Sequence, residues 1–279
     1  MFERECNVEV SELIDNVRKN GYCLIDGVVP EAQCEEIRQR LLAVVERFRS
    51  STAPERVGFV PSVINHDQSF APYLADSRLM QIATALLGHD PRISFTSVIV
   101  NEPGNARGGW HADWPFNQNN AGHIEAPYPD AIFHLTTLWM LSPFSQQNGG
   151  TLVVPGSHRR FTNPTHSDND VSVGQTVSTE INVVGSVGSV LLFDSRLWHA
   201  TSPNHTGQPR VALAVRYAPW WLNLEVLRPE STEREWLCQQ TGNDENLVPP
   251  IEPNVFERLP AEVQPLYRHW VGEPRAENP

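Results

Sequence analysis

The first fifty residues carry apolar positions at helical spacing. Between 31 and about 49 they recur every three or four residues, which predicts a long amphipathic helix packed by one face on a sheet. A shorter helix is predicted before it, capped by Ser11, running to about Lys19 and stopped by Gly21. An apolar strand follows over 22–25. The apolar positions of the long helix are Ile37, Leu41, Val44, Val45 and Phe48.

The distribution of apolar and polar residues changes twice between residues 50 and 93. Segment 50–74 is polar and contains three prolines, which predicts irregular structure. A third helix is predicted from Asp76 or Ser77 to Gly88, with its apolar residues on one face. Beyond it, short runs rich in β-branched residues are separated by Gly, Pro, Asn and Asp. The predicted strands are 93–100, 133–141, 151–154, 181–184, 189–193 and 210–217.

Short strands without intervening helices argue against a parallel α/β sheet and favour an antiparallel sandwich or jelly roll, mainly β with flanking α. The tail is rich in Pro and Glu, and we expect it to wrap the sheet with one weak helix over 258–270. No internal repeat or linker is found, so one domain is predicted over 1–279. It comprises helical support over about 8–90, a β core over about 91–220 and the tail over 221–279.

Composition restricts the partners. The net charge is −12, and an acidic chain repels phosphate backbones, so nucleic acid is not expected as a partner. No apolar run is long enough to span a membrane, and the charged opening residues do not resemble a signal peptide. The four cysteines are scattered and indicate a reducing compartment, which predicts a cytoplasmic protein.

The first candidates for metal ligands are histidine–carboxylate pairs two positions apart in the sequence. Chance alone predicts about one such pair from 10 histidines and 33 acidic residues, so context must choose. Only His111 follows a strong strand and has tryptophan on both sides, at Trp110 and Trp114, to exclude water. The other two pairs lie in polar stretches. The three pairs are His111/Asp113, His123/Glu125 and His166/Asp168.

On an extended strand, His111 and Asp113 point to one face and supply two ligands of a two-histidine, one-carboxylate triad, the arrangement that holds non-haem Fe(II). The second histidine is expected to be His199. An isolated histidine is more often a core or surface residue. However, His199 follows the strand 189–193, and Arg210 begins the next strand eleven residues later. A hairpin would place Arg210 near His199, where its guanidinium can bind a carboxylate of a diacid; without His199, a surface ion pair would be the simpler interpretation.

These residues resemble the phytanoyl-CoA dioxygenase family over about residues 10–220. The resemblance rests on His111-x-Asp113, on the segment Asn148-Gly149-Gly150-Thr151-Leu152-Val153-Val154-Pro155-Gly156-Ser157-His158, on His199-x-Thr201, on Arg210, and on the opening Asn20-Gly21-Tyr22. It implies a double-stranded β-helix (a jelly roll, cupin-like) with N-terminal helices packed on the sheet. It also implies an oxygenase that uses Fe(II), 2-oxoglutarate and O2.

Carried over residue by residue, the resemblance makes His111, Asp113 and His199 the iron ligands. Arg210 would clamp the distal carboxylate of 2-oxoglutarate, and Thr201 would help by hydrogen bonding. His158 reads as part of a structural turn. Further residues that the resemblance places on strands lining the co-substrate pocket are Asn101, Thr137 and Trp139.

The implied reaction releases succinate and CO2 and oxidises a small molecule. Because Asp113 occupies its ligand position, hydroxylation is favoured over halogenation, while desaturation, epoxidation and epimerisation stay open. Phytanoyl-CoA itself is disfavoured by the lack of a basic cluster for CoA phosphates. The loop 114–131 can form a lid, and Trp220-Trp221 can line the pocket.

Two other readings stay open. One is a jelly-roll small-molecule binding protein, disfavoured because a structural zinc site needs a fourth ligand and no nearby cysteine offers one. The other is a cupin-like metal isomerase or hydrolase that does not use 2-oxoglutarate. Arg210 discriminates between these readings, because its role is obvious only if a diacid binds. Substrate identity, regiochemistry, oligomeric state and pathway are left open.

Overall fold

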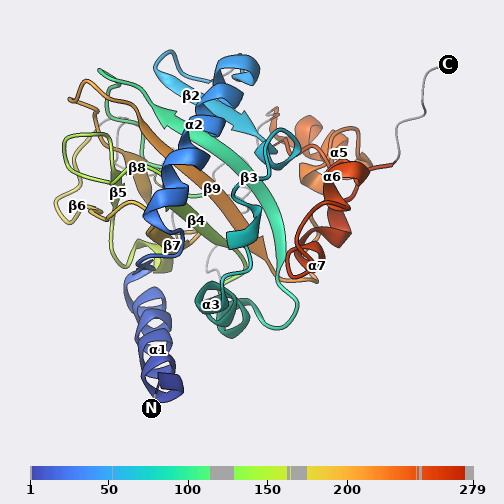
Figure 1. Ribbon diagram of the computed structural model, residues 1–279, viewed down its shortest axis with the longest axis horizontal. Helices are drawn as coiled ribbons and strands as arrows, with labels where there is room; N and C mark the ends of the chain where they lie inside the picture. The colour runs from blue at the N-terminus through green and yellow to red at the C-terminus, as the bar shows by residue number, and fades with distance from the viewer. Residues whose placement is uncertain are drawn as a thin grey trace.

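The computed structural model describes residues 2–51, 53–113, 129–161, 164, 175–242, 244 and 247–273. Its centre is a pair of antiparallel sheets (Figure 1). The larger sheet has the strand order β1-β7-β4-β9-β3-β2 and the smaller has β6-β5-β8. The predicted mainly β fold is therefore confirmed. The bounds are β1 Tyr22–Ile25, β2 Val57–Pro61, β3 Arg92–Asn101, β4 Leu135–Met140, β5 Thr151–Val153, β6 Ile181–Asn182, β7 Val190–Asp194, β8 His199–Thr201 and β9 Arg210–Ala218.

Strand β9 shows how the large sheet separates two environments. Because successive side chains of a strand point to opposite faces, alternate residues form two sets. Val211, Leu213, Val215 and Tyr217 belong to the main hydrophobic core, which they share with the N-terminal helices. The other set, which includes Arg210, Ala214 and Arg216, faces a cavity between the two sheets.

Three helices support the large sheet. Helix α2 (Glu31–Phe48) lies across its outer face (Figure 1) and buries the predicted apolar positions except Phe48. Helix α3 (Ser77–Leu87) is capped by Asp76, whose carboxylate accepts from the backbone of Arg78 and Leu79. Helix α1 (Phe2–Asn20) begins well before the predicted cap at Ser11, because no glycine or proline interrupts residues 2–10. It stops as predicted at Gly21, where φ is +90°.

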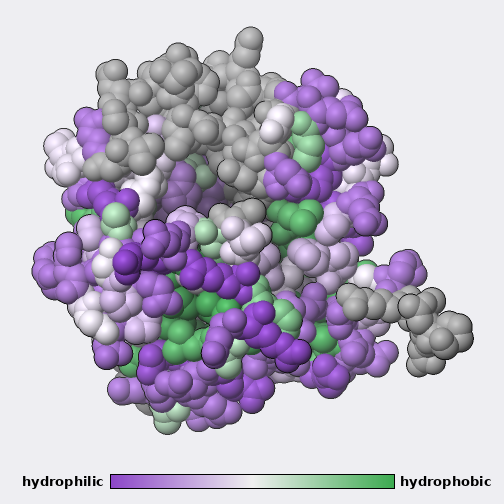
Figure 2. All heavy atoms as spheres, turned by 90° about the horizontal axis from the view of Figure 1, so that it is seen from above, coloured by the Kyte–Doolittle hydropathy of each residue, from purple (hydrophilic) through white to green (hydrophobic). Residues whose placement is uncertain are grey.

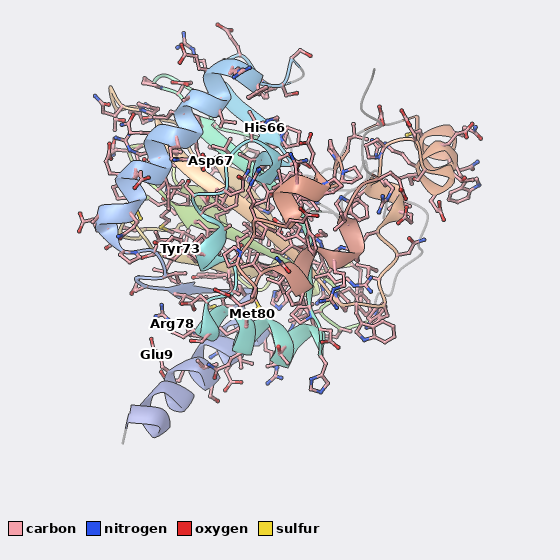
Figure 3. All side chains as sticks on the ribbon, turned by 45° about the vertical axis from the view of Figure 1, so that its right-hand side comes forward. Glu9, His66, Asp67, Tyr73, Arg78 and Met80 are labelled. Carbon is pink, nitrogen blue, oxygen red and sulfur yellow. The ribbon has the colours of Figure 1, made fainter. Side chains whose placement is uncertain are left out.

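Segment 50–74 is more regular than predicted. It contains the edge strand β2 and two short 3-10 helices, η1 (Val63–Asn65) and η2 (Ala71–Tyr73). Proline is compatible with β2 because Pro61 lies at the end of an edge strand. The segment is tied to α2, where Arg40 Nε donates to Asp67 at 2.7 Å and Phe48 stacks on His66; Figure 3 shows His66 and Asp67 beside that helix.

The tail packs beside β3 at one side of the large sheet (Figure 1), and its helices differ from the prediction. The single helix predicted over 258–270 is replaced by shorter pieces, because Pro260 and Pro265 interrupt the run. Asn65 anchors the tail by donating to the Pro250 carbonyl at 2.9 Å and accepting from the Glu252 amide at 3.0 Å. The tail elements are η4 Glu225–Leu227, α5 Thr232–Thr241, α6 Pro253–Phe256, α7 Gln264–Tyr267 and η5 Arg268–Trp270.

Hydrophilic residues make up much of the face seen from above (Figure 2). Viewed from above, hydrophobic residues gather near the middle of the face and are bordered by hydrophilic ones (Figure 2). In the described part of the chain, no helix combines the length and the apolar character needed to cross a bilayer.

Candidate metal centre

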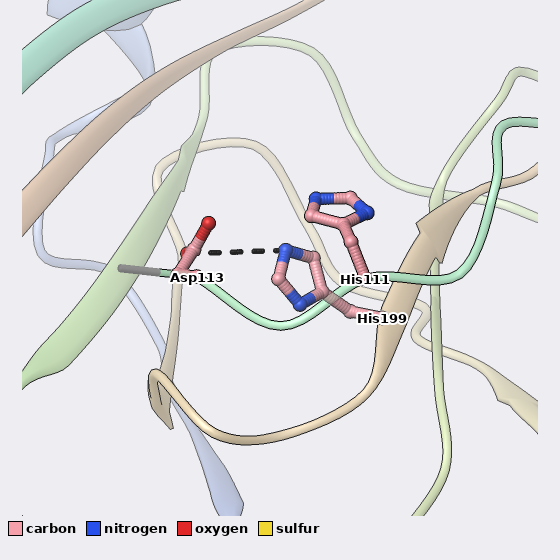
Figure 4. A group of neighbouring side chains, drawn as sticks. All are labelled: His111, Asp113 and His199. Atoms are coloured by element: carbon pink, nitrogen blue, oxygen red, sulfur yellow. Dashed lines mark ion pairs between the residues drawn. The ribbon is translucent and has the colours of Figure 1, made fainter. Parts of the chain in front are cut away.

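His111, Asp113 and His199 meet at the edge of the small sheet (Figure 4). One potential ligand atom from each lies within 4.8 Å of the others. His111 and His199 face each other as a β-bridge with backbone hydrogen bonds of 3.0 and 2.9 Å, which adds residue 111 beside β8. The Asp113 amide donates to the Ser195 carbonyl at 2.8 Å. Main-chain pairing therefore sets the spacing of the three side chains.

The two imidazoles present their Nε2 atoms as metal-ligand atoms. His111 Nδ1 lies 3.0 Å from the Gly109 carbonyl, and His199 Nδ1 lies 2.9 Å from the Leu197 carbonyl. A carbonyl only accepts, so each Nδ1 carries the hydrogen and each Nε2 keeps a lone pair. Burial, with a smaller contribution from the neighbouring His111, lowers the pKa of His199 to about 4, so its ring is neutral at pH 7. Its Nε2 lies 3.9 Å from Asp113 Oδ2.

Asp113 is buried and held through both oxygens. Arg216 Nη2 donates to Oδ1 at 2.5 Å, and Thr136 Oγ1 donates to Oδ2 at 2.7 Å. Burial alone would raise the pKa of Asp113, but the Arg216 charge, the two histidines and the Thr136 hydroxyl outweigh it and hold the pKa below its usual range. The carboxylate is therefore ionised, as a metal ligand must be.

A chain of hydroxyl groups supports Thr136 from behind. Thr136 donates to Asp113, so Ser195 must donate to Thr136, at 2.9 Å, and His134 Nδ1 must donate to Ser195, at 2.8 Å. His134 Nε2 then accepts from Ser94 at 2.7 Å. Burial lowers the pKa of His134 to about 3, which keeps the ring neutral as this direction of donation requires. The network orients Thr136 toward the carboxylate.

The donor set fits a two-histidine, one-carboxylate metal site. Two imidazole nitrogens and one carboxylate oxygen converge, and in the described residues this cluster has no fourth ligand. Three protein ligands leave coordination positions open, whereas a structural zinc site is closed by four. The arrangement therefore suits a catalytic metal such as Fe(II).

Arg210 lies in the same cavity, which has a volume of about 700 Å³. Its side chain is 3% exposed, its Nε donates to the Gly149 carbonyl at 2.9 Å, and its guanidinium lies over the Phe144 ring. Burial lowers the pKa of Arg210 to about 10, so the group remains charged at pH 7. No carboxylate of the described residues pairs with it. A buried, charged guanidinium without a carboxylate partner is stabilised by an anionic ligand. Thr201 lines the same cavity.

His199 and Arg210 line the same cavity, but the strands that carry them do not form the predicted hairpin. β8 belongs to the small sheet and β9 to the large one, so the chain crosses between sheets at 202–209. Asn204 secures this crossing by donating to the carbonyls of Asn101 and Gln208, both at 2.9 Å. The histidine and the arginine therefore belong to opposite walls.

Three predicted pocket residues lie elsewhere. Asn101 is buried and donates to the Gly149 carbonyl at 3.1 Å, so it braces the acceptor of Arg210 and does not line the cavity. Thr137 donates to the Val215 carbonyl at 2.8 Å, and Trp139 packs in the core behind the sheet. Their neighbours Thr136 and Leu138 line the cavity, because side chains of β4 alternate between its two faces.

The segment 155–158, predicted as a structural turn, contacts the N-terminal motif. The Gly156 amide donates to the Asn20 carbonyl at 2.8 Å, and His158 Nε2 lies 3.2 Å from the Arg18 carbonyl. A Cβ on Gly21 would lie 2.6 Å from His158 Nδ1, so glycine is required there by space as well as by φ.

The pairs His123/Glu125 and His166/Asp168, the flanking Trp114 and residues 114–128 of the predicted lid loop 114–131 lie outside the described residues. Trp220 and Trp221 are largely exposed and do not line the cavity.

Sequence reasoning missed Arg216 and Thr136. A signal for Arg216 was present, since it lies six residues after Arg210 on one strand and therefore shares its face. Thr136 had no comparable signal, because both faces of β4 are buried and its sequence does not alternate.

We expect Arg216→Gln to weaken Fe(II) binding by about 10–100-fold, the usual cost of losing a partner that orients a metal ligand. Competition with a ferrous chelator measures the affinity, and Arg216→Lys, which keeps the charge, should recover part of it. A rise in affinity in the glutamine variant would mean that charge repulsion between Arg216 and the metal outweighs the positioning of Asp113.

Comparison with known proteins agrees with this geometry. A family model described as phytanoyl-CoA dioxygenase matches residues 17–212, more than half of the chain. An uncharacterized protein of Mycobacterium tuberculosis is 25% identical over 222 residues, 75% of each chain. Ectoine dioxygenase of Nocardia farcinica is 27% identical over 231 residues, covering 72% of this chain and 74% of its own.

Among solved structures, HygX from Streptomyces hygroscopicus, with nickel and 2-oxoglutarate bound, matches with a TM-score of 0.60. The identity is 19%, over 76% of this chain and 88% of that chain, and such a likeness shows a shared fold. The range matched by the family model includes His111, Asp113, His199 and Arg210, and the chain belongs to the phytanoyl-CoA dioxygenase family.

Proposed function

We propose that the protein is a non-haem Fe(II)- and 2-oxoglutarate-dependent oxygenase that hydroxylates an unactivated C–H bond of a small molecule. In the net reaction, the substrate, 2-oxoglutarate and O2 give the hydroxylated product, succinate and CO2. One oxygen atom enters the product and the other enters succinate. The observation that carries the proposal is the buried Arg210, which lacks a carboxylate partner in the described chain and shares one cavity with the three-ligand cluster.

The residues take the following roles. His111, Asp113 and His199 would hold the metal, which when bound supplies the activation of O2. Arg210 would bind the distal carboxylate of 2-oxoglutarate through its guanidinium, with Thr201 contributing a hydroxyl from β8. The position between two sheets limits access of water to the reacting atoms. HygX, whose solved structure contains nickel and 2-oxoglutarate, supports the same pair of ligands here.

Anaerobic titration of the Fe(II) protein with 2-oxoglutarate tests the proposal. We expect a saturable, weak visible charge-transfer band, followed by succinate release when O2 is admitted. The proposal would be contradicted by the absence of a band from protein with iron demonstrably bound. That result would favour a cupin-like metal enzyme or a binding protein in its place.

A further inference from the structure

The cavity extends beyond the metal ligands and Arg210 to an apolar surface, which we call the outer wall. It is built from β2, β3 and the tail. Phe59 is paired with Ile99 across β2 and β3, and the rings of Phe59 and Phe95 stack with centroids 6.4 Å apart. The family model ends at residue 212, so the tail's contribution lies beyond the matched range. The outer wall consists of Phe59, Pro61, Phe95, Ile99 and Leu247.

The tail residue of this wall is held in place by hydrogen bonds. Next to Leu247, the Val248 amide donates to the Leu227 carbonyl at 2.7 Å, and Trp270 Nε1 donates to the Val248 carbonyl at 3.3 Å. Ser62 Oγ, just after β2, donates to the Pro249 carbonyl at 2.9 Å. The tail is thus joined directly to the strand that supplies the rest of the wall. Leu247 nevertheless remains 39% exposed, an apolar side chain left accessible where it borders the cavity.

Charges around the wall are neutralised within the protein. Arg216 pairs with Asp113, and Asp244 pairs with the buried Arg234 at an Nε–Oδ1 distance of 2.9 Å. Of the arginine and aspartate side chains that line the described cavity, only Arg210 lacks such a partner, and the proposed function assigns it to 2-oxoglutarate. A charged substrate would therefore lose its hydration without gaining a counter-ion from the described residues.

One polar group interrupts the wall. Ser97 lies between Pro61 and Ala214 in register across β2, β3 and β9 and lines the cavity. Its Oγ is buried and has no hydrogen-bond partner in the described structure. A buried hydroxyl without a partner is unfavourable, so this position calls for a polar atom from a ligand.

We propose that the substrate is an uncharged, largely apolar small molecule that packs on the outer wall and hydrogen-bonds to Ser97 through one polar atom. Leu247 is the specificity-determining residue contributed by the tail. This inference rests on the proposed function, because it assigns Arg210 to the co-substrate.

A matched pair of fluorescent probes tests the inference. N-Phenyl-1-naphthylamine is neutral, apolar and carries one N–H, and 8-anilino-1-naphthalenesulfonate has the same ring system with an added sulfonate. With the Fe(II) protein held anaerobically with 2-oxoglutarate, we expect the neutral probe to bind at least about 10-fold more tightly. Equal or tighter binding of the sulfonate would overturn the inference without any variant being needed.

Leu247→Glu places a charge on the outer wall and should weaken binding of the neutral probe at least about 10-fold. The matched control is Val184→Glu, the same change in charge at a residue that is 59% exposed and outside the cavity; it should leave the affinity unchanged. Unaltered 2-oxoglutarate titration in Leu247→Glu shows that the variant folds. If that titration is normal but neither glutamate variant changes probe binding, the outer-wall inference fails alone. If no 2-oxoglutarate band forms in the parent protein, the proposed function fails instead, and with it the assignment of Arg210.

Discussion

His199→Ala is expected to lower Fe(II) affinity by more than about 100-fold and to abolish succinate release. The substitution removes one of three donors, whereas losing a partner that only orients a ligand already costs about 10–100-fold. It also leaves Asp113 and His111 to bind a metal that needs three protein ligands to be held firmly. Chelator competition measures the affinity, and the 2-oxoglutarate titration should show no band.

His205→Ala is the matched control for this variant. His205 is an exposed histidine six residues later, outside the cavity, so its loss should change neither metal affinity nor turnover. Stoichiometric iron at the parent affinity in His199→Ala would remove this residue from the proposed ligand set.

Arg210→Ala is expected to raise the dissociation constant for 2-oxoglutarate at least about 30-fold. Truncating one partner of a buried charge pair costs about 2–5 kcal/mol, and the lower value corresponds to this factor. Fe(II) affinity without 2-oxoglutarate should stay unchanged, because Arg210 is not part of the ligand cluster. The anaerobic titration supplies the 2-oxoglutarate dissociation constant, and competition with a ferrous chelator supplies the Fe(II) affinity.

Two further variants sharpen this test. Arg210→Lys keeps the charge but loses the planar fork, so its 2-oxoglutarate affinity should fall between those of the parent and the alanine variant. Arg159→Ala removes the same charge from a largely exposed position outside the cavity and should have no effect. Unchanged affinity in Arg210→Ala would mean that the co-substrate carboxylate binds elsewhere.

The sequence by itself determined the features that a single segment encodes. The apolar spacing of 31–49 predicted α2 within a residue of its observed end, because an amphipathic helix carries its burial pattern in consecutive turns. The β-branched run over 210–217 likewise predicted the strand β9. The pair His111/Asp113 was selected from three candidates by its local context, and the structure brings it together with His199.

The tertiary structure decided what depends on pairing between distant segments. β4 is buried on both faces, so nothing local shows that Thr136 rather than Thr137 faces the cavity; the neighbouring strands set that choice. β2 forms a strand because it pairs with the edge of β3, and the three prolines of segment 50–74 obscured it in the sequence. His199 and Arg210 reach one cavity from opposite sheets, and Asp113 meets Arg216 across 103 residues. Local periodicity specifies which face of a segment can be buried, but only the packed sheets specify what that face meets.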